Sequence, residues 1–218
     1  LLDPVIARFL FLEGRQYDNF RLQSSFSYDT RNAGIFPDRG TLQRISAEIA
    51  MPGGDLYYYK LDYDSRYYFK LPFRRNYTFL LKGKVGYGDS YGSTFELPFF
   101  RNFFAGGPRT VRGFDEHSLG PEDIFGRALG GNILVVGNAE VILPLPLLED
   151  MQSVRISAFY DAGNVFASGD SFSFSDLRMS VGISGIWMSP FGLLSISYSN
   201  PFNDQFGDEI QKFQFNFG

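Results

Sequence analysis

Apolar and polar residues alternate with a period of two over long segments of this chain, and this alternation constrains the fold more than any other feature. In residues 56–69 one face carries tyrosine, leucine and phenylalanine, whereas the other carries Lys60, Asp62, Asp64 and Arg66. Such alternation predicts a β-strand, because successive side chains of a strand point to opposite faces. Strands of about ten or more residues are longer than the usual globular strand and are typical of tilted membrane-spanning strands.

The same alternation predicts nine strands along the chain. They are expected at residues 20–29, 41–51, 56–69, 77–88, 132–143, 153–166, 177–188, 193–200 and 210–217. Short and long connections mostly alternate between them, with 52–55 as the main exception, which is the pattern of short periplasmic turns and longer outer loops in outer-membrane barrels. Ahead of the first strand, residues 3–13 are expected to form a short helix that Asp3 caps and Gly14 ends.

Composition favours a membrane barrel over a soluble sandwich. Aromatic residues make up 18% of the chain, and those at strand ends fit the aromatic belts of a membrane interface. A chain with no cysteine and a single histidine, His117, predicts no thiolate or His-rich metal site. A net charge of −4 gives no general basic footprint for nucleic acid. The sequence has no nucleotide-binding loop or catalytic triad, so we expect neither an enzyme nor a cofactor.

An all-β fold, an antiparallel transmembrane β-barrel, is therefore expected. Bacterial single-chain barrels close with even numbers of strands, so nine strands indicate the C-terminal portion of a larger barrel. The apolar face should contact lipid and the polar face should line the lumen. The residues expected to face lipid include Tyr59, Leu61, Tyr63, Phe79, Leu81, Ile133, Val135, Ile156, Ala158, Val181 and Ile183. A soluble β-sandwich binding module is the alternative from a different class.

The longest interval without a strand pattern, residues 90–130, places Arg112 among several glycines. Gly106, Gly107 and Gly113 permit backbone conformations that other residues avoid, and the guanidinium presents a rigid fork of donors. A long loop in an all-β protein usually has a function. The loop is therefore either an exposed surface loop or one that folds into a cavity.

Strand parity predicts inward-facing carboxylates on the two strands that follow this loop. Glu140 and Asp161 both fall on the polar face, as does Arg155. An arginine shared by two carboxylates makes oriented, charge-assisted hydrogen bonds. Two interpretations stay open from the residues alone: Arg112 docks on both acids, or the acids meet only water or Arg155.

Several motifs resemble those of the BamA-type outer-membrane assembly proteins, in the order in which that family has them. They are Phe103-Phe104-Ala105-Gly106-Gly107, Val111-Arg112-Gly113-Phe114, Leu119-Gly120-Pro121, Gly130-Gly131-Asn132, Tyr160-Asp161-Ala162-Gly163, Trp187-Met188-Ser189-Pro190-Phe191-Gly192 and Phe213-Gln214-Phe215-Asn216-Phe217-Gly218. The resemblance covers essentially the whole chain and is best from residue 98 onward.

The resemblance implies a sixteen-stranded barrel preceded by periplasmic POTRA domains. Residues 1–19 would end an extracellular loop with a short helix, and 20–218 would form the C-terminal part of the barrel. The loop at about 90–130 would fold inward, with Glu140 and Asp161 as the partners of the motif arginine. The motif loop residues that the resemblance implies are Gly106, Gly107, Val111, Arg112, Gly113 and Phe114.

The function that the resemblance implies is non-enzymatic folding and insertion of client proteins in the outer membrane of a Gram-negative bacterium. The expected partners are unfolded outer-membrane protein clients, lipoproteins of the BAM complex through regions outside this sequence, and outer-membrane lipid and lipopolysaccharide. The alternative is a protein-translocating pore of the same superfamily, either TamA-like or a two-partner secretion transporter.

In that family a weak seam between the first and last strands opens sideways. On the terminal strand, parity predicts Phe213, Phe215 and Phe217 toward lipid and Lys212, Gln214 and Asn216 inward. Gly218 matches the position at which the family's last strand kinks. The family usually continues a few residues beyond this glycine to a terminal aromatic residue, which this sequence does not contain.

Overall fold

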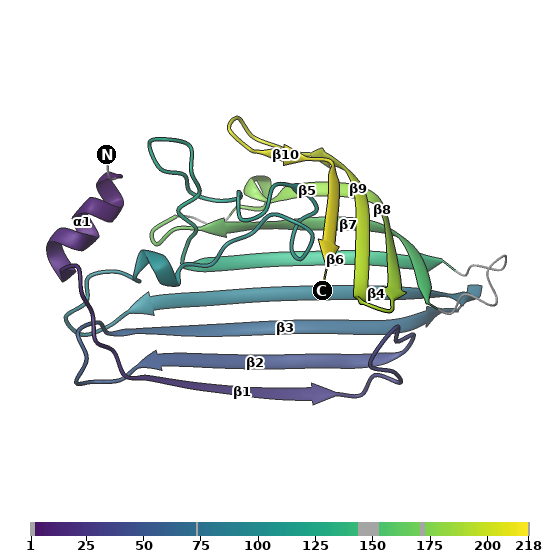
Figure 1. Ribbon diagram of the computed structural model, residues 1–218, viewed down its shortest axis with the longest axis horizontal. Coiled ribbons are helices and arrows are strands. Elements are labelled where there is room, and N and C mark those ends of the chain that lie inside the picture. Colours follow the sequence, from purple (N-terminus) through teal and green to yellow (C-terminus); the bar gives the residue numbers. More distant parts are fainter. Residues whose placement is uncertain (1–2, 73, 144–152, 171–172, 218) are drawn as a thin grey trace.

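Nine strands form one continuous antiparallel sheet in which each strand pairs with the next strand of the sheet along the chain (Figure 1). The structure, a computed structural model, describes residues 3–72, 74–143, 153–170 and 173–217. The strands of the sheet are β1 (Arg21–Asp29), β2 (Gly40–Ala50), β3 (Tyr58–Leu71), β4 (Arg74–Ser90), β6 (Ile133–Leu143), β7 (Val154–Phe166), β8 (Arg178–Ser189), β9 (Gly192–Phe202) and β11 (Phe213–Phe217). The predicted all-β architecture, with nine strands in one antiparallel sheet, is confirmed.

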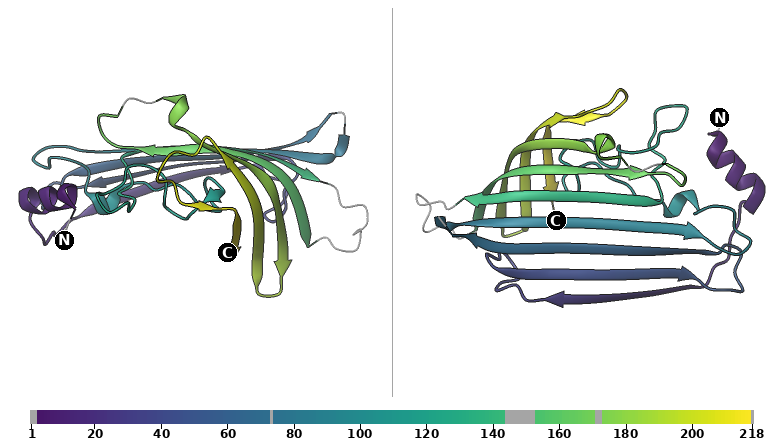
Figure 2. Two further views of the ribbon diagram at one scale, coloured as in Figure 1. Left: turned by 90° about the horizontal axis from the view of Figure 1, so that it is seen from above. Right: turned by 180° about the vertical axis from the view of Figure 1, so that it is seen from behind.

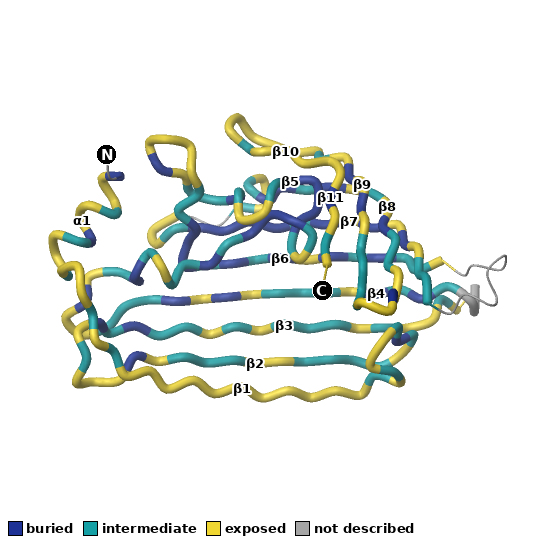
Figure 3. Tube along the Cα trace, viewed as in Figure 1, coloured by how far each residue is buried: buried dark blue, intermediate teal, exposed yellow. Residues whose placement is uncertain are grey.

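The sheet is curved, and its two faces differ in chemistry. Figure 2 shows β7, β8 and β9 bending away from the flatter part of the sheet, which leaves a concave inner face. On the convex face Ile156, Val181 and Ile183 are exposed. The inner face becomes buried over β6 and β7, where a loop covers it, whereas β1 stays exposed along its length (Figure 3). An apolar outer face and a different inner face are what a barrel wall between lipid and lumen requires.

Most of the residues expected to face lipid are exposed on the convex side. Tyr59, Phe79, Ile133 and Val135 are only half-exposed, because aromatic and branched neighbours on adjacent strands cover part of them. The exposed residues of the predicted set are Leu61, Tyr63, Leu81, Ile156, Ala158, Val181 and Ile183.

The predicted continuous strand 210–217 is wrong, because the structure divides it. Residues Ile210–Gln211 form a separate strand, β10, which pairs with β5 (Gly113–Phe114) instead of β9. Only Phe213–Phe217 pair with β9. The backbone of residues 210–211 finds its hydrogen-bond partners in the long loop, so the chain leaves the main sheet there.

A short helix and a small apolar cluster lie at one end of the sheet. The helix α1 (Pro4–Glu13) forms as predicted: Asp3 Oδ1 accepts a hydrogen bond from Val5 N at 2.7 Å, and Gly14 ends the helix with a φ of 92°. Phe9 packs in a small apolar cluster with Leu56, Tyr58 and Leu97 at the same end of the sheet. Among the described residues, no helix combines the length and the apolar character needed to cross a membrane.

Candidate functional site

The loop of residues 91–132, which connects β4 to β6, folds back over the inner face of the sheet (Figure 1). Isolated bridges join Phe103 to Gly131 and Ala105 to Leu119, so the loop has an ordered backbone. Burial of its apolar side chains against β6 and β7 favours the docked position. The cluster that forms between loop and wall contains Phe103, Ala105, Val111, Phe114, Leu119, Leu134, Val136 and Val165.

Glycines make the close approach of this loop possible. A Cβ on Gly106 would lie 2.3 Å from Asp115 O, and one on Gly113 would lie 2.9 Å from Pro201 Cγ on β9. Both residues also have positive φ values, of 102° and 93°, in a region that favours glycine. The glycines noted in the sequence are therefore required by the backbone conformation and by the proximity of the wall.

Arg112 lies in the loop directly before β5 and contacts both carboxylates that parity placed inward. Its Nε donates to Asp161 Oδ2 at 2.7 Å, and its Nη2 donates to Asp161 Oδ1 at 2.7 Å and to Glu140 Oε1 at 2.9 Å. The backbone N–H of Arg112 donates to Asp161 Oδ2 at 3.1 Å. The two-point contact with Asp161 fixes the plane of the guanidinium.

The ion pairs are almost completely removed from solvent. Arg112 is 6% exposed, Glu140 4% and Asp161 0%, and the guanidinium carbon lies 3.4 Å from the centroid of the Phe159 ring. Burial acts to lower the pKa of Arg112, but hydrogen bonds and charge from Asp161 and Glu140 outweigh it, so its pKa is raised. The arginine is therefore permanently charged in this position.

A second cation and a serine complete the surroundings of Glu140. Lys82 Nζ donates to Glu140 Oε1 at 2.7 Å, and Ser157 Oγ donates to Oε2 at 3.2 Å. Two cations thus face two carboxylates, which limits the cost of burying the charges. The alternation did not predict the role of Lys82. It gives the face on which a side chain lies, but not its neighbours on the adjacent strands.

Arg155 does not take part in this site. Although it lies on β7 as Asp161 does, its guanidinium donates to the backbone carbonyls of Phe36 and Pro37, the latter at 2.9 Å. The interpretation in which the acids meet only water or Arg155 is therefore wrong. The strand spacing accounts for this, because Arg155 lies at the start of β7 and Asp161 lies six residues further along, near the middle of the strand.

The loop also contacts the terminal strand through Gln214, for which the alternation predicted only an inward direction. Gln214 Nε2 donates to Phe114 O at 2.6 Å, and Gly113 N donates to Gln214 Oε1 at 3.3 Å. Gln214 is 3% exposed. The pairing of β10 with β5 extends the same contact, with Asp115 N donating to Glu209 O at 2.8 Å.

The aromatic side chains of the terminal strand point the other way. Phe213, Phe215 and Phe217 are 61%, 58% and 56% exposed, on the face opposite Gln214. Lys212, which was predicted to point inward, is exposed at the break between β10 and β11. Gly218 lies outside the described residues.

Small residues on the inner wall make room for the site. A Cβ on Gly182 would lie 2.6 Å from Phe159 Cζ, so the ring that stacks on Arg112 needs a glycine beneath it. Apart from Arg178 at the start of β8, the other buried inner positions of β8 and β9 are serines. Small residues recur on this face, and they could have predicted from the sequence that a segment of the chain packs closely against the inner wall. They are Ser180, Gly182, Ser184, Ser197 and Ser199.

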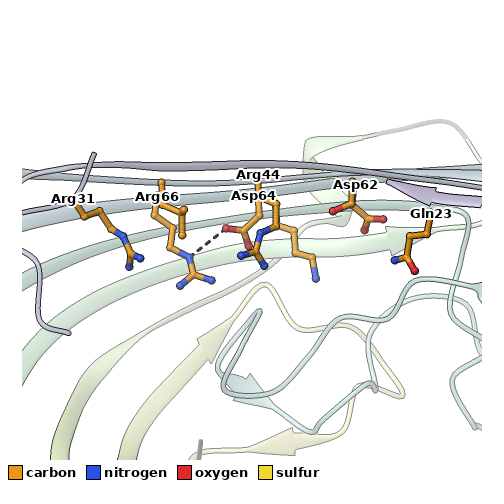
Figure 4. A pocket seen from close by; sticks show the side chains of 9 residues that line it. Gln23, Arg31, Arg44, Asp62, Asp64 and Arg66 are labelled. Carbon is orange, nitrogen blue, oxygen red and sulfur yellow. Dashed lines mark hydrogen bonds and ion pairs between the residues drawn. The ribbon is translucent and has the colours of Figure 1, made fainter. Parts of the chain in front are cut away.

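The inner face of β1–β4 is charged and open. A cavity of about 520 Å³ there is lined by nine residues that include Arg44, Asp62, Asp64, Arg66 and Lys84 (Figure 4). Arg66 Nε donates to Asp64 Oδ1 at 3.2 Å, as expected for neighbouring residues on the polar face of β3. In the part of the chain that the structure describes, no three His, Cys, Asp or Glu residues are grouped to hold a metal ion.

Comparisons with known proteins agree with this architecture. The model of the Omp85 superfamily domain matches residues 6–218. The outer membrane protein assembly factor BamA of Neisseria meningitidis serogroup B is 35% identical over 86% of this chain. The sorting and assembly machinery component 50 homolog of Mus musculus is 30% identical over 90% of the chain.

A solved structure gives the same result in three dimensions. The crystal structure of BamA from Haemophilus ducreyi lacking POTRA domains 1–3 superimposes with a TM-score of 0.89 over 98% of this chain, at 28% identity. The chain spans 27% of the length of the Neisseria protein, 45% of the mouse protein and 47% of the Haemophilus chain. Its sheet is an outer-membrane β-barrel wall of the Gram-negative type, left open because only part of the barrel is present. The chain belongs to the Omp85 superfamily and corresponds to the C-terminal portion of a BamA barrel.

Proposed function

We propose that this chain is the part of an outer-membrane assembly factor that carries the working edge for client β-barrel proteins. One observation carries the proposal. The loop of residues 91–132 holds Ile210–Gln211, just before the terminal strand β11, away from the main sheet. Residues 210–211 pair with the loop and not with β9, so the ladder between β11 and β9 begins only at Phe213. By comparison, β9 pairs with β8 as far as Phe202 but with β11 only as far as Tyr198.

A short terminal ladder provides a physical basis for insertion through a seam. Unpaired backbone N–H and C=O groups at a sheet edge can template a strand from another chain. A seam formed by the first strand of the whole barrel and this short strand would break at low cost, and a client strand would add to the exposed edge. Edge pairing needs no catalytic residue and no cofactor.

In this proposal Arg112 is an anchor. Its contacts with Asp161 and Glu140 hold the loop on the wall, and the loop in turn holds Gln214 and β10. The clients would be unfolded outer-membrane proteins, in the surrounding lipid and lipopolysaccharide. Lipoproteins of the BAM complex would bind the parent protein through regions outside this sequence.

The experiment reconstitutes the whole parent protein in liposomes and supplies an unfolded outer-membrane client. We expect the client to become folded and membrane-embedded, as judged by protease protection and heat-modifiable mobility in gels. Arg112→Ala should lower the yield strongly, whereas Arg109→Ala, an exposed residue of the same loop, should not. Client that crosses into the liposome interior would instead support a translocating pore, and equal yields with empty liposomes would refute the proposal.

A further inference from the structure

The connection between β1 and β2 turns inward instead of staying at the rim. Residues 31–39 lie on the concave side of the sheet, at the end opposite α1 (Figures 1 and 2). Hydrogen bonds within the connection give it a defined shape: Asn32 Oδ1 accepts from Asp38 N at 3.1 Å and from Arg39 N at 3.2 Å, and Asn32 Nδ2 donates to Asp38 Oδ1 at 2.9 Å. We call residues 31–39 the strap.

Arg155 holds the strap from the other side of the inner face. It is on β7, four strands beyond β2 in the sheet order. Its guanidinium donates to the carbonyl oxygens of Phe36 and Pro37, and its central carbon lies 4.8 Å from the Phe36 ring centroid. Charged donors to backbone carbonyls are among the stronger hydrogen bonds.

The strap has an unfavourable backbone conformation that its contacts must maintain. Phe36 has a φ of 54°, which is uncommon for a bulky residue other than glycine. The next residue of the strap, Pro37, is buried although it lies in a connection between strands. A third contact secures it, since Lys70 Nζ at the end of β3 lies 2.9 Å from Asp38 Oδ2.

The strap and the motif loop approach the same group of inner-wall residues from opposite ends. A cavity of about 250 Å³ separates the strap from Glu140, and its lining includes Phe36, Pro37, Leu80, Lys82 and Arg155. Lys82 and Glu140 belong to the site of Arg112. The inner space is thus bounded by the loop on one side and by the strap on the other.

We infer that the strap closes the end of the barrel lumen opposite α1 and that Arg155 is the residue that holds it closed. Release of the strap would open the part of the lumen that lies behind it, next to Leu80 and Glu140. The inference concerns the lumen and does not depend on how clients enter the membrane, so it can fail independently of the proposed function.

The test places a single thiol behind the strap in the whole parent protein, held in lipid nanodiscs. Leu80→Cys puts that thiol in the strap cavity, and this chain has no cysteine of its own. We expect slow reaction with a charged, membrane-impermeant thiol reagent. Adding Arg155→Ala should accelerate the reaction about tenfold or more, because two charge-assisted hydrogen bonds to the strap are lost.

Two matched variants control for general effects. Arg44→Ala removes an exposed inner-wall cation whose Nε donates to Ser27 Oγ at 3.0 Å, and it should leave the Leu80→Cys rate unchanged. Gln23→Cys, which lines the open cavity of Figure 4, should react fast in every background. The inference is overturned if Leu80→Cys reacts as fast as Gln23→Cys without further change, or if Arg155→Ala leaves its rate unaltered.

A second measurement covers the case in which Arg155→Ala does not fold. Pro37→Cys and Ile186→Cys, which line the same cavity, are combined with Arg155 intact and treated with a short bifunctional thiol reagent. We expect efficient intramolecular cross-linking in the folded barrel. Two thiols that both react but do not cross-link would show that the strap does not lie over the lumen, and would also overturn the inference.

Discussion

Gln214 on the terminal strand and Phe114 in the motif loop are joined by a hydrogen bond of 2.6 Å, although they lie 100 positions apart in the chain. The Gln214 side chain also accepts from Gly113 N at 3.3 Å. One side chain therefore connects the loop that Arg112 anchors to the strand that ends the sheet. This link is the structural basis for treating the loop and the terminal strand as one unit.

Replacing Gln214 by Ala should loosen that unit. Phe114 O and Gly113 N would lose buried partners, so we expect a loss of about 1–3 kcal/mol in the free energy of unfolding. Equilibrium unfolding of the parent protein in liposomes measures it. Asn216→Ala is the control on the same strand and face, since Asn216 contributes only its backbone carbonyl to the contact with Ser195. Equal losses in both variants would contradict the link.

Replacing Arg112 by Ala should be more costly. Asp161 would lose its main partner and Glu140 one of its two cationic partners, and breaking a buried ion pair typically costs about 3–5 kcal/mol. If Asp161 is the dominant partner, Asp161→Asn should add much less in the Arg112→Ala background than it does alone. Additive effects in this double-mutant cycle, measured by unfolding, would show that the two residues do not act as a pair. Arg112→Lys should recover only part of the stability, because lysine lacks the planar fork.

Two glycine variants separate a required glycine from a tolerated one. Gly113→Ala should destabilise the loop by more than about 1 kcal/mol, because its φ is 93° and the added carbon would meet Pro201. Gly137→Ala on β6 should be neutral or stabilising, since nothing lies within 4 Å of the added carbon. Protease sensitivity of the loop reports the first effect. Indistinguishable variants would mean that the loop does not lie against β9.

Ile183→Arg tests the outward direction of β8. Ile183 is 60% exposed on the convex face, and an arginine on the lipid side near mid-membrane costs about 2–4 kcal/mol. Phe206→Arg, at a fully exposed loop position, should have no comparable effect on folding in liposomes. A harmless Ile183→Arg would mean that this face does not contact lipid.

Alternation in the sequence predicted most of the sheet because each strand has one apolar and one polar face. That pattern placed Glu140 and Asp161 inward, and the glycines around Arg112 indicated an unusual loop. The alternation reports the face of a residue but not its partner strand. For this reason residues 210–217 looked like one strand, although β10 pairs with β5 and only β11 pairs with β9.

Contacts between distant segments could not be predicted in the same way. Lys82 meets Glu140 because of the register between β4 and β6, and Arg155 meets the strap because the β1–β2 connection folds across the inner face. Neither contact leaves a periodic signal. The contact of Arg155 also depends on the curvature of the sheet, which results from the packing of all strands together.

The central claim is that the terminal strand forms a seam that must open for clients to be inserted. The most direct measurement joins Asn216→Cys to a cysteine at an inward position of the first strand of the parent barrel and compares client insertion before and after reduction. We predict that the oxidised protein does not insert clients and that reduction restores insertion, while each single-cysteine variant remains active throughout. Full insertion by a completely oxidised protein would contradict the claim.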